Sequence, residues 1–177
     1  MSLRSICTPY IICFALLLNF SETQAQQEGE LDKRSGFKDI KLGQPLDSVR
    51  GVKLKKEFKE ADNVNPSKLY EIEHPDYSMI GEIKVHKIEV KTYRDLVYEI
   101  KVTTEKDPRL MKAMESVYGP TTYDAKNIRY FWKSDKMILN YESISKKELL
   151  LEYRSFTVPK MMSDDKAKKI ENIANDF

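Results

Sequence analysis

Histidines are the side chains best suited to acid–base or metal chemistry near neutral pH, and the sequence contains two, His74 and His86. His74 stands in the segment His-Pro-Asp, where the carboxylate of Asp76 could join it in binding a metal. His86 falls in a segment with a strand pattern, beside a point where a side chain could be re-aimed. Because no His-Glu-x-x-His spacing is present, we interpret them as a surface turn histidine and a solvent-facing strand histidine.

Acidic and nucleophilic residues show no catalytic pattern either. Glu71 and Glu73 would be same-face neighbours in a strand and could form a carboxylate pair, but a charged solvent face explains them more simply. No serine lies in a Gly-x-Ser-x-Gly motif, and the six glycines form neither a Gly-x-Gly-x-x-Gly motif nor a P-loop. We therefore predict no catalytic residue, no metal site and no cofactor, and we expect a protein that is not an enzyme.

The N-terminal segment has the three parts of a secretory signal peptide. Arg4 is basic, Ile11–Leu18 is apolar, and a polar stretch with small residues ends at Ala25. The apolar run falls short of the roughly 20 residues that span a bilayer. Neither Cys7 nor Cys13 follows a lipobox-like sequence, so no lipid anchor is expected. The sequence predicts export to the periplasm or the extracellular space after cleavage near Ala25, no stable membrane insertion, and a cysteine-free mature chain stabilised by its core.

Charge and composition describe one ordinary domain after that segment. The net charge is +2, and the charged residues, 33% of the chain, are interspersed rather than blocked. This pattern favours neither nucleic acid nor an anionic membrane as a partner. We expect residues 26–35 to be a flexible leader, because they have almost nothing to bury, and residues 36–177 to form a single α+β domain.

The best-specified element is a helix over 107–118. Asp107 is a favourable N-cap, Pro108 suits the first helical position, and Gly119 with Pro120 stops the helix. Apolar side chains recur at helical spacing on one face: Leu110, Met111, Met114, Val117 and Tyr118. We predict that this face packs on a sheet, which would leave the opposite face of the sheet, or the loops at its edges, as the functional surface.

Strand patterns flank the predicted helix on both sides. The alternation over Ile83–Val90 slips by one position, which predicts a β-bulge near His86–Lys87. Tyr93–Asp95 then turns the chain into a strand in which Leu96, Tyr98, Ile100 and Val102 alternate. Three more strands are predicted at Ile128–Trp132, Met137–Tyr141 and Leu149–Tyr153.

Two further helices are predicted at the ends of the domain. Leu46 and Val49 indicate one or two helical turns that end near Gly51. A C-terminal helix is expected to begin at Ser163, with an apolar stripe formed by Ala167, Ile170, Ala174 and Phe177. The predicted fold class is α+β: an antiparallel meander of about five to six strands, a central helix on one face, and a short helix at either end.

Aromatic residues fall on the predicted strands: Tyr98, Tyr130, Trp132, Tyr141 and Tyr153. Tyrosine and tryptophan combine a large apolar body with a polar tip, which suits protein interfaces. One hypothesis is that a sheet face presents these rings to a partner; the alternative is that they fill the core.

Two stretches resemble one known group of proteins. Ile40–Val49 (Ile-Lys-Leu-Gly-Gln-Pro-Leu-Asp-Ser-Val), and Tyr118-Gly119-Pro120 followed by the strand with Trp132, resemble signatures of BamE/SmpA-like and β-lactamase-inhibitor-like proteins, which are small exported bacterial α+β domains. The resemblance implies a non-catalytic module for protein–protein contact. The missing lipobox departs from the lipid-anchored members.

These observations favour a non-enzymatic exported binding or accessory protein of the bacterial cell envelope, whose partner is an envelope or secreted protein. The first alternative is a carrier that holds a small apolar ligand or lipid between sheet and helix, with methionines as an adaptable lining: Met111, Met114, Met161 and Met162. The second alternative is a hydrolase that uses His74 or His86 with nearby acids.

Overall fold

The computed structural model describes residues 29–59 and 64–177, so the predicted signal peptide lies outside the described residues. The strands are β1 (Gly36–Phe37), β2 (Ile40–Lys41), β3 (Val52–Phe58), β4 (Ser67–Ile72), β5 (Met79–Ile80), β6 (Ile83–Tyr93), β7 (Leu96–Glu105), β8 (Thr122–Asp124), β9 (Arg129–Lys133), β10 (Met137–Ser143) and β11 (Glu148–Ser155). The helices are the short η1 (Pro75–Tyr77), α2 (Pro108–Tyr118) and α3 (Thr157–Ala174), together with helical residues 29–34.

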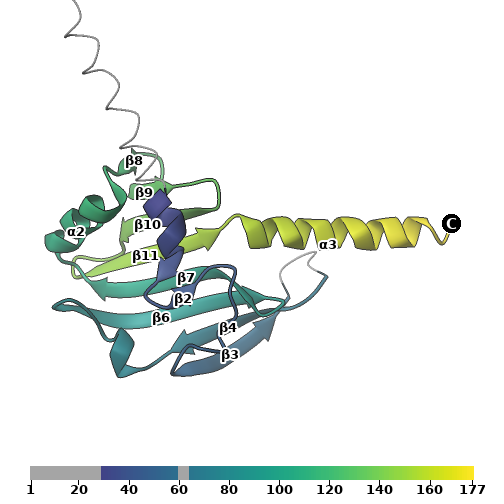
Figure 1. The fold of residues 1–177 in the computed structure, drawn as a ribbon, viewed down its shortest axis with the longest axis horizontal. Helices are drawn as coiled ribbons and strands as arrows, with labels where there is room; N and C mark the ends of the chain where they lie inside the picture. The colour runs from purple at the N-terminus through teal and green to yellow at the C-terminus, as the bar shows by residue number, and fades with distance from the viewer. Residues whose placement is uncertain (1–28, 60–63) are drawn as a thin grey trace, which may run out of the picture.

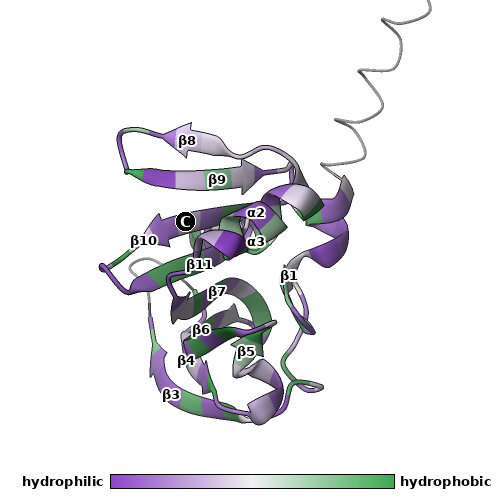
Figure 2. Cartoon of the chain, turned by 90° about the vertical axis from the view of Figure 1, so that its left-hand side faces the viewer, coloured by the Kyte–Doolittle hydropathy of each residue, from purple (hydrophilic) through white to green (hydrophobic). Residues whose placement is uncertain are grey.

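One antiparallel sheet dominates the fold. Its strands follow the order β3-β4-β6-β7-β11-β10-β9-β8, with β5 paired to β6, while β1 and β2 form a separate hairpin. Figure 2 shows the strands succeeding one another as a single curved layer from β8 to β3. The chain leaves β7 in the middle of this layer, passes through α2 to the outer strand β8, and returns strand by strand to β11, which pairs with β7. Helix α2 is therefore the connection between the middle and one edge of the sheet.

The predicted fold class is wrong in the size of the sheet and in the place of the helix. The sheet has nine strands rather than five or six, and α2 lies toward its β8–β11 end rather than over its centre (Figure 1). The strands that the prediction missed show little alternation of buried and exposed residues. Strands β5 and β8 have only two and three residues, and β3 is a mostly exposed, lysine-rich edge strand. Lysines on an edge strand hinder pairing with other chains, but they also remove the alternation by which a strand is recognised.

The predicted hairpin of β6 and β7 is confirmed. The register shifts between Val85 and Lys87, so His86 is the extra residue of a β-bulge at the predicted position. Arg94 and Asp95 form the two-residue turn, and both have positive φ angles, 50° and 62°, as a type I′ turn requires. This turn matches the twist of the two longest strands of the sheet.

Helix α2 has the predicted boundaries and buried face. The Asp107 carboxylate accepts a hydrogen bond from the Arg109 N–H at 2.8 Å, and Gly119 follows the last turn with a φ of 84°. Leu110 and Met114 are buried in the main core, where they pack with residues of the sheet. This core also holds Leu31, which belongs to the helical residues 29–34. The expectation of a flexible leader therefore does not hold for these residues, because one leucine is enough to dock a helical turn.

The two end helices differ from prediction. Residues 46–51 form turns rather than a helix, since Pro45 and Gly51 bracket too few residues for helix nucleation. Helix α3 begins at Thr157, six residues before Ser163, because Pro159 is tolerated in a first turn and the Ser155 hydroxyl accepts hydrogen bonds from the N–H groups of Thr157 and Val158. The predicted apolar stripe of α3 is exposed from Ala167 onward, and Figure 1 shows the helix running away from the sheet.

The face of the sheet opposite the main core is polar in its centre. Glu99 and Glu152 are buried there, on neighbouring strands, and both contact Lys101 and Arg154 at 3.0–3.6 Å. Near the β6–β7 turn a small second cluster (Tyr93, Tyr98, Val158 and Met162) joins the start of α3 to the sheet. No helix of residues 29–59 and 64–177 is long and apolar enough to cross a membrane.

Candidate ligand pocket

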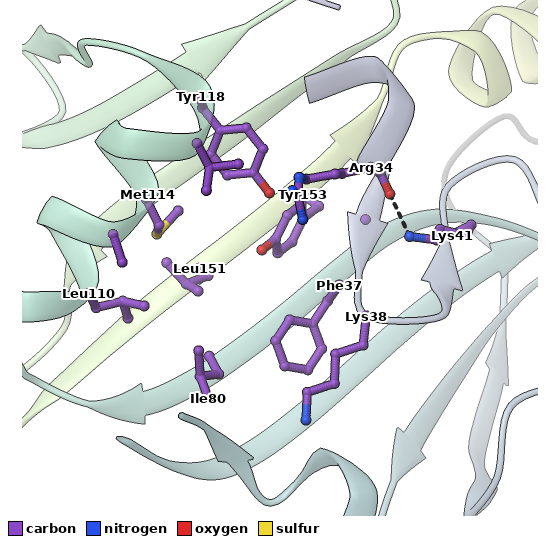
Figure 3. Close-up of a pocket in the computed structure, with 13 residues that line it drawn as sticks. Arg34, Phe37, Lys38, Lys41, Ile80, Leu110, Met114, Tyr118, Leu151 and Tyr153 are labelled. Atoms are coloured by element: carbon purple, nitrogen blue, oxygen red, sulfur yellow. Dashed lines mark hydrogen bonds between the residues drawn. The ribbon is translucent and has the colours of Figure 1, made fainter. Parts of the chain in front are cut away.

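A pocket of about 300 Å³ opens on the core side of the sheet, between α2, β11 and the segment that contains β1 and β2 (Figure 3). Pockets of this size are at the lower end of those that hold small molecules in proteins. The pocket lies on the same face as α2, whereas the sequence had directed attention to the opposite face. Its lining divides into an apolar end and a polar end.

The apolar end is built from three separate elements. Leu110 and Met114 of α2 form one wall, Leu151 of β11 forms the floor, and Ile80 of β5 with Phe37 of β1 closes the other side (Figure 3). The helical spacing of four residues places Leu110 and Met114 on the same face of α2. Alternation along β11 turns Leu151 toward the helix. This end can therefore hold a hydrocarbon chain without leaving a polar group unpaired.

The β1–β2 hairpin fixes the second wall of the pocket. Gly36 has a φ of 155°, and a Cβ atom at this position would lie 2.1 Å from the carbonyl oxygen of Ile40. Only glycine lets the two strands approach so closely. Beyond the hairpin, the N–H of Gly43 donates to the carbonyl of Val97 at 2.7 Å, and the N–H of Val97 donates to Gln44 at 3.0 Å. The wall is thereby attached to the sheet at β7.

Two tyrosine hydroxyls mark the polar end of the pocket. Tyr153 extends from β11 and is 4% exposed, and Tyr118 is the last residue of α2. Burial raises the pKa of both phenols, so both are neutral hydrogen-bond donors at physiological pH. Neither hydroxyl has a hydrogen-bond partner among the residues that the structure describes. Neither oxygen is among the fully buried polar atoms without a partner, so both are accessible from the open pocket, and in Figure 3 that of Tyr153 points into it.

Three cationic residues line the pocket and differ in place and contacts: Lys38 lies beside Phe37, at the apolar end, whereas Arg34 lies near the two phenols (Figure 3). Lys38 donates to the carbonyl oxygens of Asp76 and Met79, so its role is to fix the loop around η1. Lys41 donates to the carbonyl oxygen of Arg34 at 2.7 Å, and burial lowers the pKa of its ammonium group. The positive charge of Arg34 lowers the pKa of Tyr118 and so offsets part of the increase that burial causes, as expected for a guanidinium near that phenol (Figure 3). The polar end thus combines positive charge with neutral donors.

The two histidines meet at a second, more polar pocket of about 400 Å³. His74 caps η1, where its Nδ1 accepts the N–H of Asp76 at 3.3 Å, and His86 is the bulged residue of β6. The pocket also contains Glu73. In the part of the chain described, no three histidine, cysteine or acidic side chains are placed to hold a metal ion. Glu71, the other acid considered for a carboxylate pair, forms an ion pair with Lys55 at 2.7 Å.

The five aromatic residues predicted from sequence do not form one surface. Tyr98, Trp132, Tyr141 and Tyr153 are buried, and only Tyr130, at 40%, is exposed. The exposed-surface hypothesis is therefore wrong for these four rings, whose strands lie inside the sheet rather than at its edge. A β-bulge at Tyr98 moreover turns this ring into the second cluster, away from Ile100 and Val102 in the main core.

A smaller aromatic group runs from the core to the surface, where Tyr123 and Tyr130 are exposed. Tyr123 of β8, Tyr130 of β9 and Tyr141 of β10 occupy one cross-strand row, which continues to Leu151 in the core. The ring centroids lie 5.0 Å apart for Tyr123 and Tyr130, and 6.3 Å apart for Tyr130 and Tyr141. We call these three residues the tyrosine row. Tyr123, which is 52% exposed, was not recognised from sequence because its strand is too short to show alternation.

The four methionines proposed as a ligand lining are divided between two places. Met114 lines the pocket, and Met111 packs against the main core from a partly buried position. Met161 and Met162 belong to the second cluster, which lies under α3. Two residues that sequence analysis did not single out for binding, Arg34 and Lys41, line the pocket instead. They could not be found from sequence, since Arg34 fell in the expected leader.

Comparison of the chain with protein-family models, with curated proteins and with solved structures finds no match. The resemblance to BamE/SmpA-like and β-lactamase-inhibitor-like domains therefore stays a prediction. Function has to be argued from the geometry of the chain itself.

Proposed function

We propose that this protein is a non-enzymatic binding protein that holds one small molecule with an apolar body between α2 and the sheet. The observation that carries the proposal is the open pocket of about 300 Å³ that adjoins the main core. Its apolar lining, contributed by α2, β11 and β5, is what supports an occupant with an apolar body, because binding sites for small molecules are concave and mostly apolar. With the predicted signal peptide, we expect this binding to occur in the periplasm or outside the cell.

The apolar lining explains how such a molecule would be held. Leu110, Met114 and Leu151 are all buried side chains that nonetheless border the pocket. The apolar surface that a ligand would remove from water belongs mainly to their partly exposed neighbours Ile80 and Val117, and this removal is worth about 25 cal/mol for each Å² buried. Met114 is unbranched and flexible, so it can adapt to ligands of different shape.

Native mass spectrometry of the purified protein tests the proposal. We expect a mass above that of the polypeptide, which falls to the apo mass on extraction with organic solvent. A blocking variant gives the matched comparison: Ala113→Trp places a large ring at an exposed position that lines the pocket. Ser116→Trp, on the exposed side of the same helix, is the control. An apo mass for the wild-type protein, together with no uptake of added apolar ligands, would overturn the proposal.

A second candidate function, contact with an envelope or secreted protein, is favoured by the tyrosine row. Tyr123 and Tyr130 are exposed beside β8, the last strand of the sheet, which is paired on one side only. Tyrosines are enriched at the energetic centres of protein interfaces. The double variant Tyr123→Ser, Tyr130→Ser would keep the fold but lose a partner captured by crosslinking in envelope fractions. A partner retained by the folded double variant would exclude this surface.

A further inference from the structure

We propose that the pocket selects a molecule with a carboxylate head group and an apolar chain, a medium-chain fatty acid in chemical class, and that Arg34 and Lys41 hold the carboxylate. This inference rests on the proposed ligand-binding function. It goes further by assigning the polar end of the pocket to the recognition of negative charge. Apolar side chains at one end, and the Arg34 guanidinium with two neutral donors at the other, match the two parts of such a molecule (Figure 3), and Lys41 bonds the main chain of Arg34 from the other side of the β1 segment.

Arg34 has unused donors for a carboxylate. Its Nε lies 3.5 Å from Glu30, and the other carboxylate oxygen of Glu30 accepts a hydrogen bond from Lys33 at 2.9 Å. The two terminal nitrogens of Arg34 have no partner among the residues that the structure describes. A guanidinium with free terminal nitrogens can bind a carboxylate through two parallel hydrogen bonds, which is the strongest common arrangement for this pair.

Lys41 is a partly buried cation without a counter-ion in contact. The hydrogen bond to the Arg34 carbonyl satisfies one of its three donors, and no carboxylate of the described residues lies within ion-pair distance. Burial lowers the pKa of Lys41, which means that the protein disfavours its charged form. The negative charge of Asp39 offsets only part of this effect, and a bound anion would stabilise the charged form further. A methionine or leucine would suit an apolar wall better if nothing charged were bound there.

The two phenols complete the site. Tyr118 and Tyr153 each carry a hydroxyl without a partner in the described part of the chain. As neutral donors they can give hydrogen bonds to carboxylate oxygens, and such bonds to a charged acceptor are stronger than those between neutral groups. Lys38 is not assigned this role, because it lies beside Phe37 at the apolar end and two of its three donors already bond carbonyl oxygens.

The size of the pocket limits the chain length. At about 30 Å³ for each water-sized volume, 300 Å³ holds roughly ten non-hydrogen atoms. Octanoate has this size, and octanamide has the same shape without the charge. The pair therefore separates recognition of the carboxylate from burial of the hydrocarbon chain.

The experiment is calorimetric titration of the purified protein with octanoate and, separately, with octanamide. We expect octanoate to bind at least about tenfold more tightly, and the octanoate affinity alone to fall as NaCl is raised. The double variant Arg34→Gln, Lys41→Met should lose the preference for octanoate and bind the two ligands with similar affinity. Lys126→Met, at an exposed position in the β8–β9 turn, is the control and should keep the preference.

The outcomes separate this inference from the proposed function. Equal, salt-independent binding of both ligands to the wild-type protein would overturn the head-group inference and leave the ligand-binding proposal standing. A preference for octanoate that survives in the double variant would overturn the assignment to Arg34 and Lys41. Binding of neither ligand would overturn both. Because the wild-type comparison and its salt dependence need no variant, the test holds even if the double variant does not fold.

Discussion

The indole N–H of Trp132 donates a hydrogen bond to the carbonyl oxygen of Gly119 at 2.8 Å. Trp132 is buried in β9, and Gly119 is the residue at which α2 ends. The indole ring also lies 6.0 Å from the ring of Tyr118, which lines the polar end of the pocket. One side chain therefore attaches both the end of the helix and a pocket residue to the sheet.

Trp132→Phe should destabilise the protein by about 1–3 kcal/mol, because it keeps an aromatic ring but leaves the buried Gly119 carbonyl without its donor. Urea denaturation followed by far-ultraviolet circular dichroism measures the change. Tyr130→Phe, on the same strand but exposed, should stay within about 0.5 kcal/mol of the wild type. A Trp132→Phe protein as stable as Tyr130→Phe would show that the hydrogen bond contributes nothing.

Met114→Asp should unfold the domain, since it places a charge without a partner in the main core. The matched control is Lys112→Asp on the exposed face of the same helix, which should change stability by about 0.5 kcal/mol or less. Thermal melting of both variants measures the contrast. A soluble Met114→Asp protein with a normal melting temperature would mean that α2 is peripheral to the fold.

Local signals account for the elements that sequence analysis predicted well. The boundaries of α2 depend on Asp107, Pro108 and Gly119, which act within one helical turn, and all three behave as predicted. The bulge at His86 shows in the sequence as a slip of alternation. The bulge at Tyr98 does not, because Leu96, Tyr98, Ile100 and Val102 alternate without a break; it arises from the register between the strands that the Arg94–Asp95 turn connects.

The candidate site was the least predictable part, because it depends on contacts between distant segments. Arg34 reaches the pocket only because Leu31 docks its helical turn in the core. Tyr118 is the last residue of α2, whereas Tyr153 lies on β11, with three strands between them in the chain. The two side chains line the same pocket because β11 returns to pair with β7. Neither relationship leaves a pattern of spacing along the chain. By contrast, the tyrosine row contains Tyr130 and Tyr141, which sequence analysis did select.

Glu99→Gln should destabilise the protein by about 1–3 kcal/mol, because the Glu99 side chain is 6% exposed and contacts three cations. Lys91 lies at 3.0 Å, Arg154 at 3.3 Å and Lys101 at 3.6 Å, and the variant would leave them facing one another with less compensating charge. Glu89→Gln, whose side chain is 33% exposed and pairs with Lys87 at 2.8 Å, is the control.

The loss of stability in the two glutamate variants should depend differently on salt concentration. The small effect of Glu89→Gln, below about 0.5 kcal/mol, should vanish in 1 M NaCl, because exposed ion pairs are screened. The larger effect of Glu99→Gln should persist, since buried pairs are screened much less. Urea denaturation at low and high salt measures both. Equal effects for the two variants at every salt concentration would contradict a buried charge network on this face.

Asp165→Ala should loosen α3 from the sheet without unfolding the rest of the domain. The Asp165 carboxylate accepts hydrogen bonds from the Tyr93 hydroxyl at 2.9 Å and from Arg94 at 3.2 Å, both at the β6–β7 turn. The second cluster also joins α3 to the sheet through a few apolar side chains, and every residue from Lys166 onward is exposed. We expect hydrogen exchange to accelerate within residues 157–165 by about 10- to 100-fold, which corresponds to about 1–3 kcal/mol. Asp164→Ala, exposed and adjacent, is the matched control; equal protection in both variants would show that Asp165 does not anchor the helix.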